Sequence, residues 1–181
     1  TSQKNIRDQK KVKFLKTHNS LITAFGNDFT KPEYSLGVIY IIRDPRNVIT
    51  SLKNHFKYSS YENALKFLLN EKNVIGIKNS KSEVDLPHII SSWKNHYNSW
   101  CKFNKNFLLI KYEDLIIDPL KEFVKISNYL EKLLNKKFSK EEIIKSIKNC
   151  NFDNLKLKEE TSGFVESQKN INNKSIPFFY L

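Results

Sequence analysis

The sequence predicts an α/β fold in which a parallel sheet is covered by helices on both faces. Three short runs, at residues 12–17, 37–42 and 107–111, are rich in β-branched, aromatic and other apolar residues, as buried strands are. Segments with helical periodicity follow these runs, and strands that alternate with helices form parallel sheets. With 181 residues the chain can build one core of ordinary size, so we expect a single domain over residues 1–181.

The strand candidates differ in composition. Residues 12–17, VKFLKT, mix lysines with apolar residues, whereas residues 37–42, GVIYII, are almost continuously apolar. Asp44 and Pro45 follow the second run and supply an N-cap side chain and a residue preset for the first helical turn. Apolar residues then recur at helical spacing, namely Val48, Ile49, Leu52 and Phe56. The sequence therefore predicts a strand, a tight turn and a helix.

Two more helices are expected before the third strand. The first is YENALKFLLN at residues 61–70, and the second begins near Pro87. The second helix is indicated by one apolar stripe, which consists of Ile89, Ile90, Trp93, Tyr97 and Trp100. Both are expected to cover the sheet.

Two helices are predicted after the strand at residues 107–111. Asp118 and Pro119 open the first, whose apolar face repeats at Leu120, Phe123, Val124, Ser127 and Leu130. Ser139 and Glu142 form a capping box for the second, which extends to about Asn149. From Asp153 onward the periodicity fades, and we expect a surface loop there.

The net charge of +12 attracts anions such as nucleotides, nucleic acids or acidic membranes. The lysines are dispersed through every segment, so the charge equally fits a lysine-rich proteome and names no partner. Cys101 and Cys150 lack the spacing of a metal site or of a disulfide scaffold, which fits a reducing compartment. No apolar run approaches the roughly 20 residues of a membrane span. We therefore expect a cytoplasmic protein with no membrane partner and no metal.

An anion site is indicated at the predicted strand–turn–helix unit. Arg43 ends the buried strand, and Ser51 lies eight residues later in the following helix. Arginine offers a planar fork of donors to a phosphate, serine adds a hydroxyl, and the helix N-terminus adds its positive end. Read structurally, Arg43 would instead pair with a carboxylate and Ser51 would face solvent. Spacing alone leaves both interpretations open.

The segment RDPRNVITSLKNHF, residues 43–56, resembles the 3'-phosphate-binding motif of the sulfotransferases, which use 3'-phosphoadenosine 5'-phosphosulfate (PAPS) as donor. Three further segments resemble family segments in the same order: FLKTH at residues 14–18, SWKNHYNSW at residues 92–100 and LLIKYEDLIIDP at residues 108–119. The resemblance covers nearly the whole chain. It implies a P-loop-NTPase-like sulfotransferase fold without its first strand and phosphosulfate loop.

The resemblance implies roles for four residues. Arg43 and Ser51 correspond to the pair that holds the 3'-phosphate of PAPS, and Lys16 and His18 correspond to the lysine and histidine of the reacting centre. An imidazole, with an ordinary pKa of about 6.5, can take the proton of an acceptor hydroxyl as general base. A fixed cation stabilises the charge that develops on the oxygens during transfer. Alternatively, His18 is a loop histidine and Lys16 one lysine among many.

Two aromatic residues resemble the adenine wall of the family. Tyr112 in KYEDL corresponds to the tyrosine that contacts adenine, and Phe152 in KNCNFDNL corresponds to the phenylalanine that stacks on the base. Both could equally be core residues. At Phe152 the family often has Thr-Ser before the phenylalanine, whereas this chain has Cys150 and Asn151.

The sequence departs from the family at its two ends. The Lys-Ser-Gly-Thr type loop for the 5'-phosphosulfate has no counterpart, and the chain stops at PFFYL where an Arg-Lys-Gly stretch is expected next. Together with the absence of methionine, this predicts a domain truncated at both ends. The native gene is expected to encode both elements.

The implied function is transfer of a sulfuryl group from PAPS to a hydroxyl or amine of a small-molecule acceptor, without a metal. Other interpretations stay open: an inactive relative that binds 3'-phosphoadenosine nucleotides, or a basic nucleic-acid-binding domain, although no zinc-finger spacing or RNP-type motif is present. A kinase would need a Walker-type loop, which the sequence lacks. The remaining histidines, His55, His88 and His96, are expected to be structural or exposed.

Overall fold

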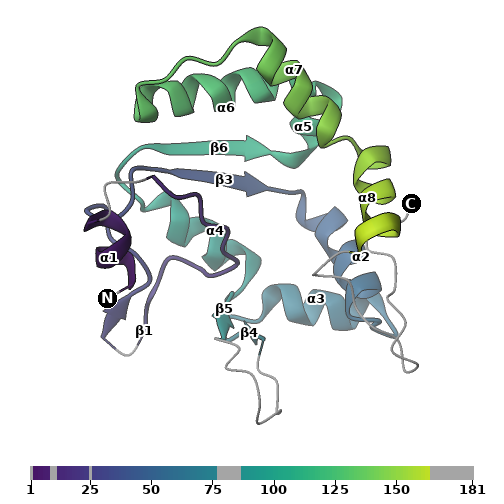
Figure 1. Cartoon of the computed structure of the whole chain (residues 1–181). Helices are drawn as coiled ribbons and strands as arrows, with labels where there is room; N and C mark the ends of the chain where they lie inside the picture. The colour runs from purple at the N-terminus through teal and green to yellow at the C-terminus, as the bar shows by residue number, and fades with distance from the viewer. Residues whose placement is uncertain (1, 9–11, 25, 77–86, 164–181) are drawn as a thin grey trace. The chain divides into compact units, whose positions relative to one another are not determined.

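The computed structural model describes residues 2–8, 12–24, 26–76 and 87–163 (Figure 1). The chain divides into two compact units, which are described separately below. The first unit ends at Asp114 and the second begins at Leu115. No helix within the described part of the chain is long and apolar enough to cross a membrane.

The first unit alternates short strands and helices. In chain order its described elements are α1 (Ser2–Asp8), β1 (Thr23–Ala24), β2 (Asn27–Asp28), β3 (Val38–Ile42), α2 (Pro45–His55), α3 (Tyr61–Leu69), β4 (Val74–Ile75), β5 (His88–Ile89), α4 (Trp93–Cys101) and β6 (Phe107–Lys111). The short helix α5 (Tyr112–Ile117) runs across the boundary between the units.

Strands β3 and β6 form the parallel sheet, and Figure 1 shows their arrows pointing the same way. Val38 lies opposite Phe107 at one end of the ladder, and Ile42 lies opposite Lys111 at the other. The chain therefore leaves both strands at the same edge, with Arg43 after β3 and Tyr112 after β6. The predicted α/β class with a parallel sheet is confirmed, as are the strands near residues 37–42 and 107–111.

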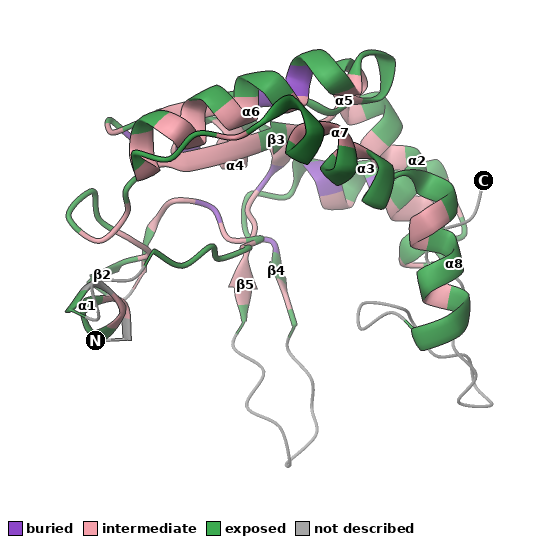
Figure 2. Cartoon of the chain, turned by 45° about the horizontal axis from the view of Figure 1, so that its top comes forward, coloured by how far each residue is buried: buried purple, intermediate pink, exposed green. Residues whose placement is uncertain are grey.

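The core of the first unit lies where α3 and α4 pack beside this sheet. Figure 2 marks the buried segments in purple. The buried apolar residues of the described chain are Ala64, Leu68, Trp100, Phe103 and Ile110. Tyr40 of β3 packs against α4, since its ring centroid lies 6.0 Å from that of Tyr97. Helix α4 thus packs against the sheet through Tyr40.

The predicted strand at residues 12–17 is wrong, because this segment is not in a strand and pairs with none of the strands that the structure describes. Val12, Phe14 and Leu15 have exposed fractions of 52%, 70% and 70%. Apolar composition alone does not make a strand, since the backbone N–H and C=O groups of a strand need a partner. In the described chain each sheet has two strands, so the expected three-stranded sheet is not seen.

Helices α2 and α3 confirm two predictions. Asp44 caps α2, and its side chain accepts a hydrogen bond from the backbone N–H of Arg46, while Pro45 occupies the first turn. Ser60 caps α3 in the same way. The ring centroids of Phe56 and Phe67 lie 5.1 Å apart, so the end of α2 packs on α3.

Helix α4 begins later than predicted. Ser92 is its N-cap and accepts a hydrogen bond from the backbone N–H of Asn95 at 3.3 Å. The residues just after Pro87 form β5, which pairs antiparallel with β4. Ser91, between β5 and α4, has a φ of 63°, so the chain is not helical there. The apolar residues Ile89 and Trp93 therefore belong to different elements.

The described part of the second unit, up to residue 163, consists of helices. After α5 come α6 (Pro119–Leu134), α7 (Lys140–Asn149) and α8 (Phe152–Ser162). Asp118 caps α6, and Asn135 ends it in the left-handed region with a φ of 49°. The capping box is confirmed, since the backbone N–H of Glu142 donates to Ser139 Oγ and that of Ser139 donates to Glu142 Oε2.

The predicted loop from Asp153 is wrong as far as Ser162, because these residues belong to α8. The Asn151 side chain accepts a hydrogen bond from the backbone N–H of Asn154 at 2.8 Å and starts the helix. Helix α8 has only three apolar residues, Phe152, Leu155 and Leu157, and they do not repeat along one helical face, so sequence periodicity could not detect it. The rest of the predicted loop, from residue 164 onward, lies outside the described residues.

Candidate functional site

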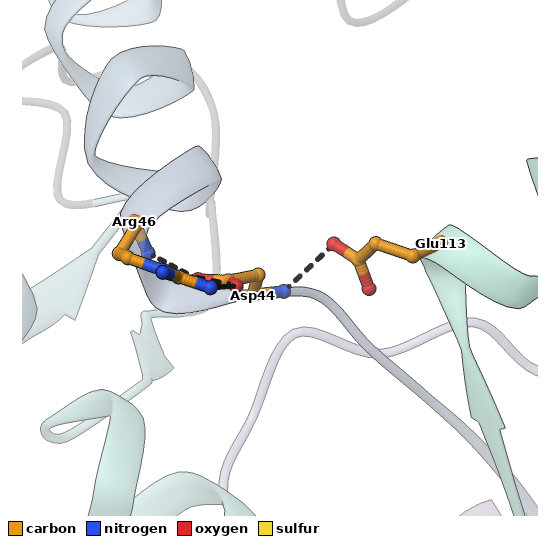
Figure 3. A network of polar contacts seen from close by, with 3 residues as sticks. All are labelled: Asp44, Arg46 and Glu113. Atoms are coloured by element: carbon orange, nitrogen blue, oxygen red, sulfur yellow. Dashed lines mark hydrogen bonds and ion pairs between the residues drawn. The ribbon is translucent and has the colours of Figure 1, made fainter.

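The turn between β3 and α2 is fixed by a hydrogen-bonded acidic residue (Figure 3). The Asp44 carboxylate accepts bonds from the backbone N–H and the side chain of Arg46, with 2.8 Å to the backbone nitrogen. The backbone N–H groups of Asn47 and Val48 donate to the Asp44 carbonyl. The backbone N–H groups of the first turn of α2 thus already have Asp44 as their acceptor. An anion at this turn would therefore be bound by side-chain donors.

Glu113 ties the end of β6 to this turn. Its Oε1 accepts a hydrogen bond from the backbone N–H of Asp44 at 2.9 Å (Figure 3). This bond holds the pKa of the Glu113 carboxyl below its usual value. Sequence reasoning did not identify Glu113, although its position directly after Tyr112 in KYEDL is the signal that could have pointed to it.

Arg43, Ser51 and Tyr112 come together at the edge where both strands end. Arg43 Nη1 donates to Ser51 Oγ at 2.9 Å, and the guanidinium carbon lies 4.8 Å from the centroid of the Tyr112 ring. Arg43 Nε is buried without a hydrogen-bond partner. Among the residues that the structure describes, no carboxylate pairs with Arg43, which speaks against the interpretation of Arg43 as half of an ion pair.

This cluster can bind an anion through two kinds of donor. Arg43 donates one hydrogen bond to Ser51 through Nη1, and its remaining donors include the buried Nε. Because Ser51 Oγ accepts from Arg43, its own hydrogen is free to point toward a further acceptor. A buried N–H without a partner is costly unless an acceptor joins it. The face of Tyr112 adds a flat aromatic surface beside the cation.

Lys16 and His18 lie on the exposed segment before β1. This segment is held by hydrogen bonds to neighbouring elements in place of a strand ladder. The backbone N–H of Ser20 donates to the Ile89 carbonyl at 2.8 Å, and Trp100 Nε1 donates to the Asn19 carbonyl at 2.9 Å. The predicted strand at residues 12–17, which ends just before His18, is therefore replaced by an irregular segment that β5 and α4 hold.

The His18 ring stands edge-on to the ring of His88, with 6.0 Å between centroids.

Phe152 is the first residue of α8 in the second unit and is 38% exposed. Tyr112 has a similar exposed fraction of 37%. The described residues contain no group of three His, Cys, Asp or Glu side chains that could hold a metal ion.

We expect the Arg46→Ala substitution to raise the pKa of Asp44 from about 2 toward its ordinary value of 3.8, because the side chain of Arg46 is the main cause of the lowering. A lowered pKa means that the ion pair stabilises the fold above the unfolded pKa and that this contribution is lost as pH falls through the folded pKa. Carboxyl NMR titration of both proteins measures the shift. An unchanged Asp44 pKa in the variant would contradict this account of the turn.

The comparisons with known proteins agree on one family. A family profile described as "Sulfotransferase domain" matches residues 1–180. The chain is 26% identical over 181 residues to luciferin sulfotransferase of Photinus pyralis, covering 95% of this chain and 43% of the relative. It is 29% identical over 147 residues to sulfotransferase 2A1 of Macaca fascicularis, covering 77% of this chain and 47% of the relative. The chain thus spans less than half of these relatives.

One solved structure supports the fold. The crystal structure of a mouse sulfotransferase complexed with PAP matches 69% of this chain and 41% of its own chain, with a TM-score of 0.51 and 22% identity. At this identity the likeness concerns the fold. The predicted P-loop-like α/β architecture is therefore confirmed.

Proposed function

Because the chain belongs to the sulfotransferase family, we propose that its protein transfers a sulfuryl group from PAPS to a hydroxyl or amine of a small-molecule acceptor. The observation that carries the proposal is the cluster of Arg43, Ser51 and Tyr112 at the carboxyl edge of the parallel sheet. Ligands of open α/β folds bind at this edge. The anion-binding donors of the cluster match the needs of a phosphorylated nucleotide.

In this proposal the 3'-phosphate of PAPS binds to Arg43 and Ser51. Arg43 Nη1 and Ser51 Oγ are hydrogen-bonded, so one phosphate can reach both side chains. Arg43 Nε, which has no hydrogen-bond partner, supplies a further donor. Charge-assisted bonds from a guanidinium to a phosphate are the strong ones. The hydrogen bond from the backbone N–H of Asp44 to Glu113 Oε1 helps to hold the backbone next to Arg43 in place.

The adenine of PAPS would contact Tyr112, whose ring already lies against the Arg43 guanidinium. From the resemblance we assign the role of stacking on the base to Phe152, which is partly exposed at the start of α8. Aromatic faces suit a purine because both surfaces are flat and polarisable. Each of these two assignments rests on the resemblance of the surrounding motif.

The reaction would use Lys16 and His18. The acceptor oxygen or nitrogen attacks sulfur, the bond between sulfur and the 5'-phosphate oxygen breaks, and His18 takes the acceptor proton as general base. Lys16 would stabilise the negative charge that grows on the oxygens around sulfur and on the leaving 5'-phosphate. Both side chains are exposed, as residues that meet a substrate from solution need to be.

The names of the relatives indicate the class of acceptor. One relative is a luciferin sulfotransferase and another, from Oryctolagus cuniculus, is an amine sulfotransferase. Both names refer to small molecules, so we propose a small-molecule acceptor here. As the sequence and the family resemblance imply, we also propose a cytoplasmic location and a reaction without a metal.

The test is a transfer assay with the protein encoded by its complete gene. Radiolabelled PAPS is incubated with phenol, alcohol and amine acceptors, and labelled product and released PAP are measured together. We expect product and PAP in equal amounts with at least one acceptor class. Tight PAP binding without any transfer would contradict the proposal and favour an inactive nucleotide-binding relative. Salt-dependent DNA binding with no response to PAP would favour a nucleic-acid-binding protein.

A further inference from the structure

A chain of two hydrogen bonds links the parallel sheet to the backbone of His18. The Tyr40 hydroxyl of β3 lies 2.8 Å from His96 Nδ1, and His96 Nε2 lies 3.3 Å from the His18 carbonyl oxygen. His96 belongs to α4, so this helix stands between the strand and the segment that carries His18. Along the sequence His96 lies 56 positions from Tyr40 and 78 positions from His18.

The chemistry of these partners fixes the direction of both hydrogen bonds. A carbonyl oxygen only accepts, so His96 Nε2 carries the proton that is donated to His18. In a neutral imidazole the other nitrogen then accepts, so the Tyr40 hydroxyl donates to Nδ1. Burial lowers the pKa of His96 and raises that of Tyr40, which keeps both side chains neutral. His96 therefore has one defined tautomer.

The hydrogen bond from His96 holds a segment, residues 12–20, that has no hydrogen bonds of a strand ladder to support it. Residues 12–20 belong to no strand, so the backbone of His18 is held by side chains and by single contacts. The residues after His18 have anchors of their own, since the Ile89 N–H donates to Asn19 Oδ1 and the Ser20 hydroxyl donates to the Ile90 carbonyl. His96 supplies the anchor at His18 itself.

We propose that His96 is a positioning residue: its Nε2–H, oriented by Tyr40, holds the backbone of His18 at a fixed place relative to β3. Tyr40 lies on the strand that ends directly before Arg43, so the same strand would locate both the base and the phosphate site. A catalytic group that shifts by about 1 Å costs up to roughly 10²-fold in rate. This inference rests on the proposed function through the role of His18.

The first test reads the tautomer directly, without any need for activity. In ¹⁵N-histidine NMR of the wild-type protein, the proposal requires His96 to be neutral with its proton on Nε2. The Tyr40→Phe variant removes the donor to Nδ1 and is expected to give a mixture of tautomers. A wild-type His96 with its proton on Nδ1, or a tautomer unaffected by Tyr40→Phe, would overturn the proposal.

The second test uses two amides that each mimic one ring nitrogen. The His96→Gln variant keeps a donor near the position of Nε2, whereas His96→Asn keeps a polar group only near Nδ1. We expect His96→Asn to lower kcat on the order of tenfold and His96→Gln to retain most of kcat, with the Kd for PAP unchanged in both. Equal values of kcat for the two variants would contradict a donor role of Nε2.

Comparison of the His96 variants with His18→Ala separates this inference from the proposed function. If His18→Ala leaves turnover intact, the assignment of His18 as base fails, whatever the His96 variants do. If His18→Ala abolishes turnover while His96→Asn does not lower kcat, the base stands and the positioning role is wrong. Should His96→Asn fail to fold, the wild-type tautomer decides the matter alone.

Discussion

The His18→Ala substitution is expected to lower kcat by roughly 10²- to 10⁴-fold, the usual range for the loss of a general base. The proton of the acceptor must leave as the bond to sulfur forms, and no other imidazole is assigned to this step. The measurement is steady-state kinetics of the protein encoded by its complete gene, with PAPS and a working acceptor. It is the largest effect that the account predicts.

Two controls show whether the lost rate is a lost base. The Kd for PAP should barely change, because the contacts assigned to the phosphate come from Arg43 and Ser51. The plot of kcat/KM against pH should lose its acid limb in His18→Ala, since that limb reports protonation of the base in the free enzyme. Near-normal turnover with an unchanged acid limb would show that His18 is only a loop residue.

Sequence reasoning predicted the elements that combine a periodic apolar pattern with a capping signal. Strand β3 and helix α2 were predicted because a continuous apolar run precedes Asp44 and Pro45. Helix α7 was predicted because Ser139 and Glu142 form a capping box, and the structure shows both of its hydrogen bonds. These signals are local, so one sequence is enough to read them.

The failures concern features that depend on distant partners or lack an apolar stripe. The run VKFLKT at residues 12–17 has strand-like composition, but no strand in the described part of the chain pairs with it. Helix α8 has its cap at Asn151, but its few apolar residues do not line one face, so its pattern resembles that of a polar loop. The start of α4 was misplaced because β5 adds apolar residues just before it.

In the candidate site, too, local features could be predicted from the sequence and long-range contacts could not. Arg43 and Ser51 lie within one strand–turn–helix unit, so the motif could assign both to one anion site, and the structure shows that they are in contact. The contact of Glu113 with Asp44 spans 69 residues, and that of His96 with His18 spans 78. Local patterns do not show which distant residue completes a turn or holds a loop. The position of Glu113 after Tyr112 marks it as a candidate, but its partner and that of His96 were found only in the folded chain.

The Arg43→Ala substitution is expected to weaken PAP binding by roughly 10- to 150-fold, because a hydrogen bond to a charged group is worth roughly 1.5 to 3 kcal/mol. Ser51→Ala should cost less, since its hydroxyl is neutral. Lys53→Ala is the charge-matched control: it removes one positive charge from the same helix, but its ammonium lies over the Tyr61 ring. Calorimetric titration of the three variants with PAP gives the comparison.

The measurement that tests the central claim most directly compares two nucleotides on two proteins. Calorimetry gives the Kd of PAP and of adenosine 5'-phosphate, which lacks the 3'-phosphate, for the wild-type protein and for Arg43→Ala. The account predicts that the wild type prefers PAP and that the substitution removes most of this preference while it barely changes the affinity for adenosine 5'-phosphate. Equal losses of affinity for both nucleotides would contradict the claim that Arg43 holds the 3'-phosphate.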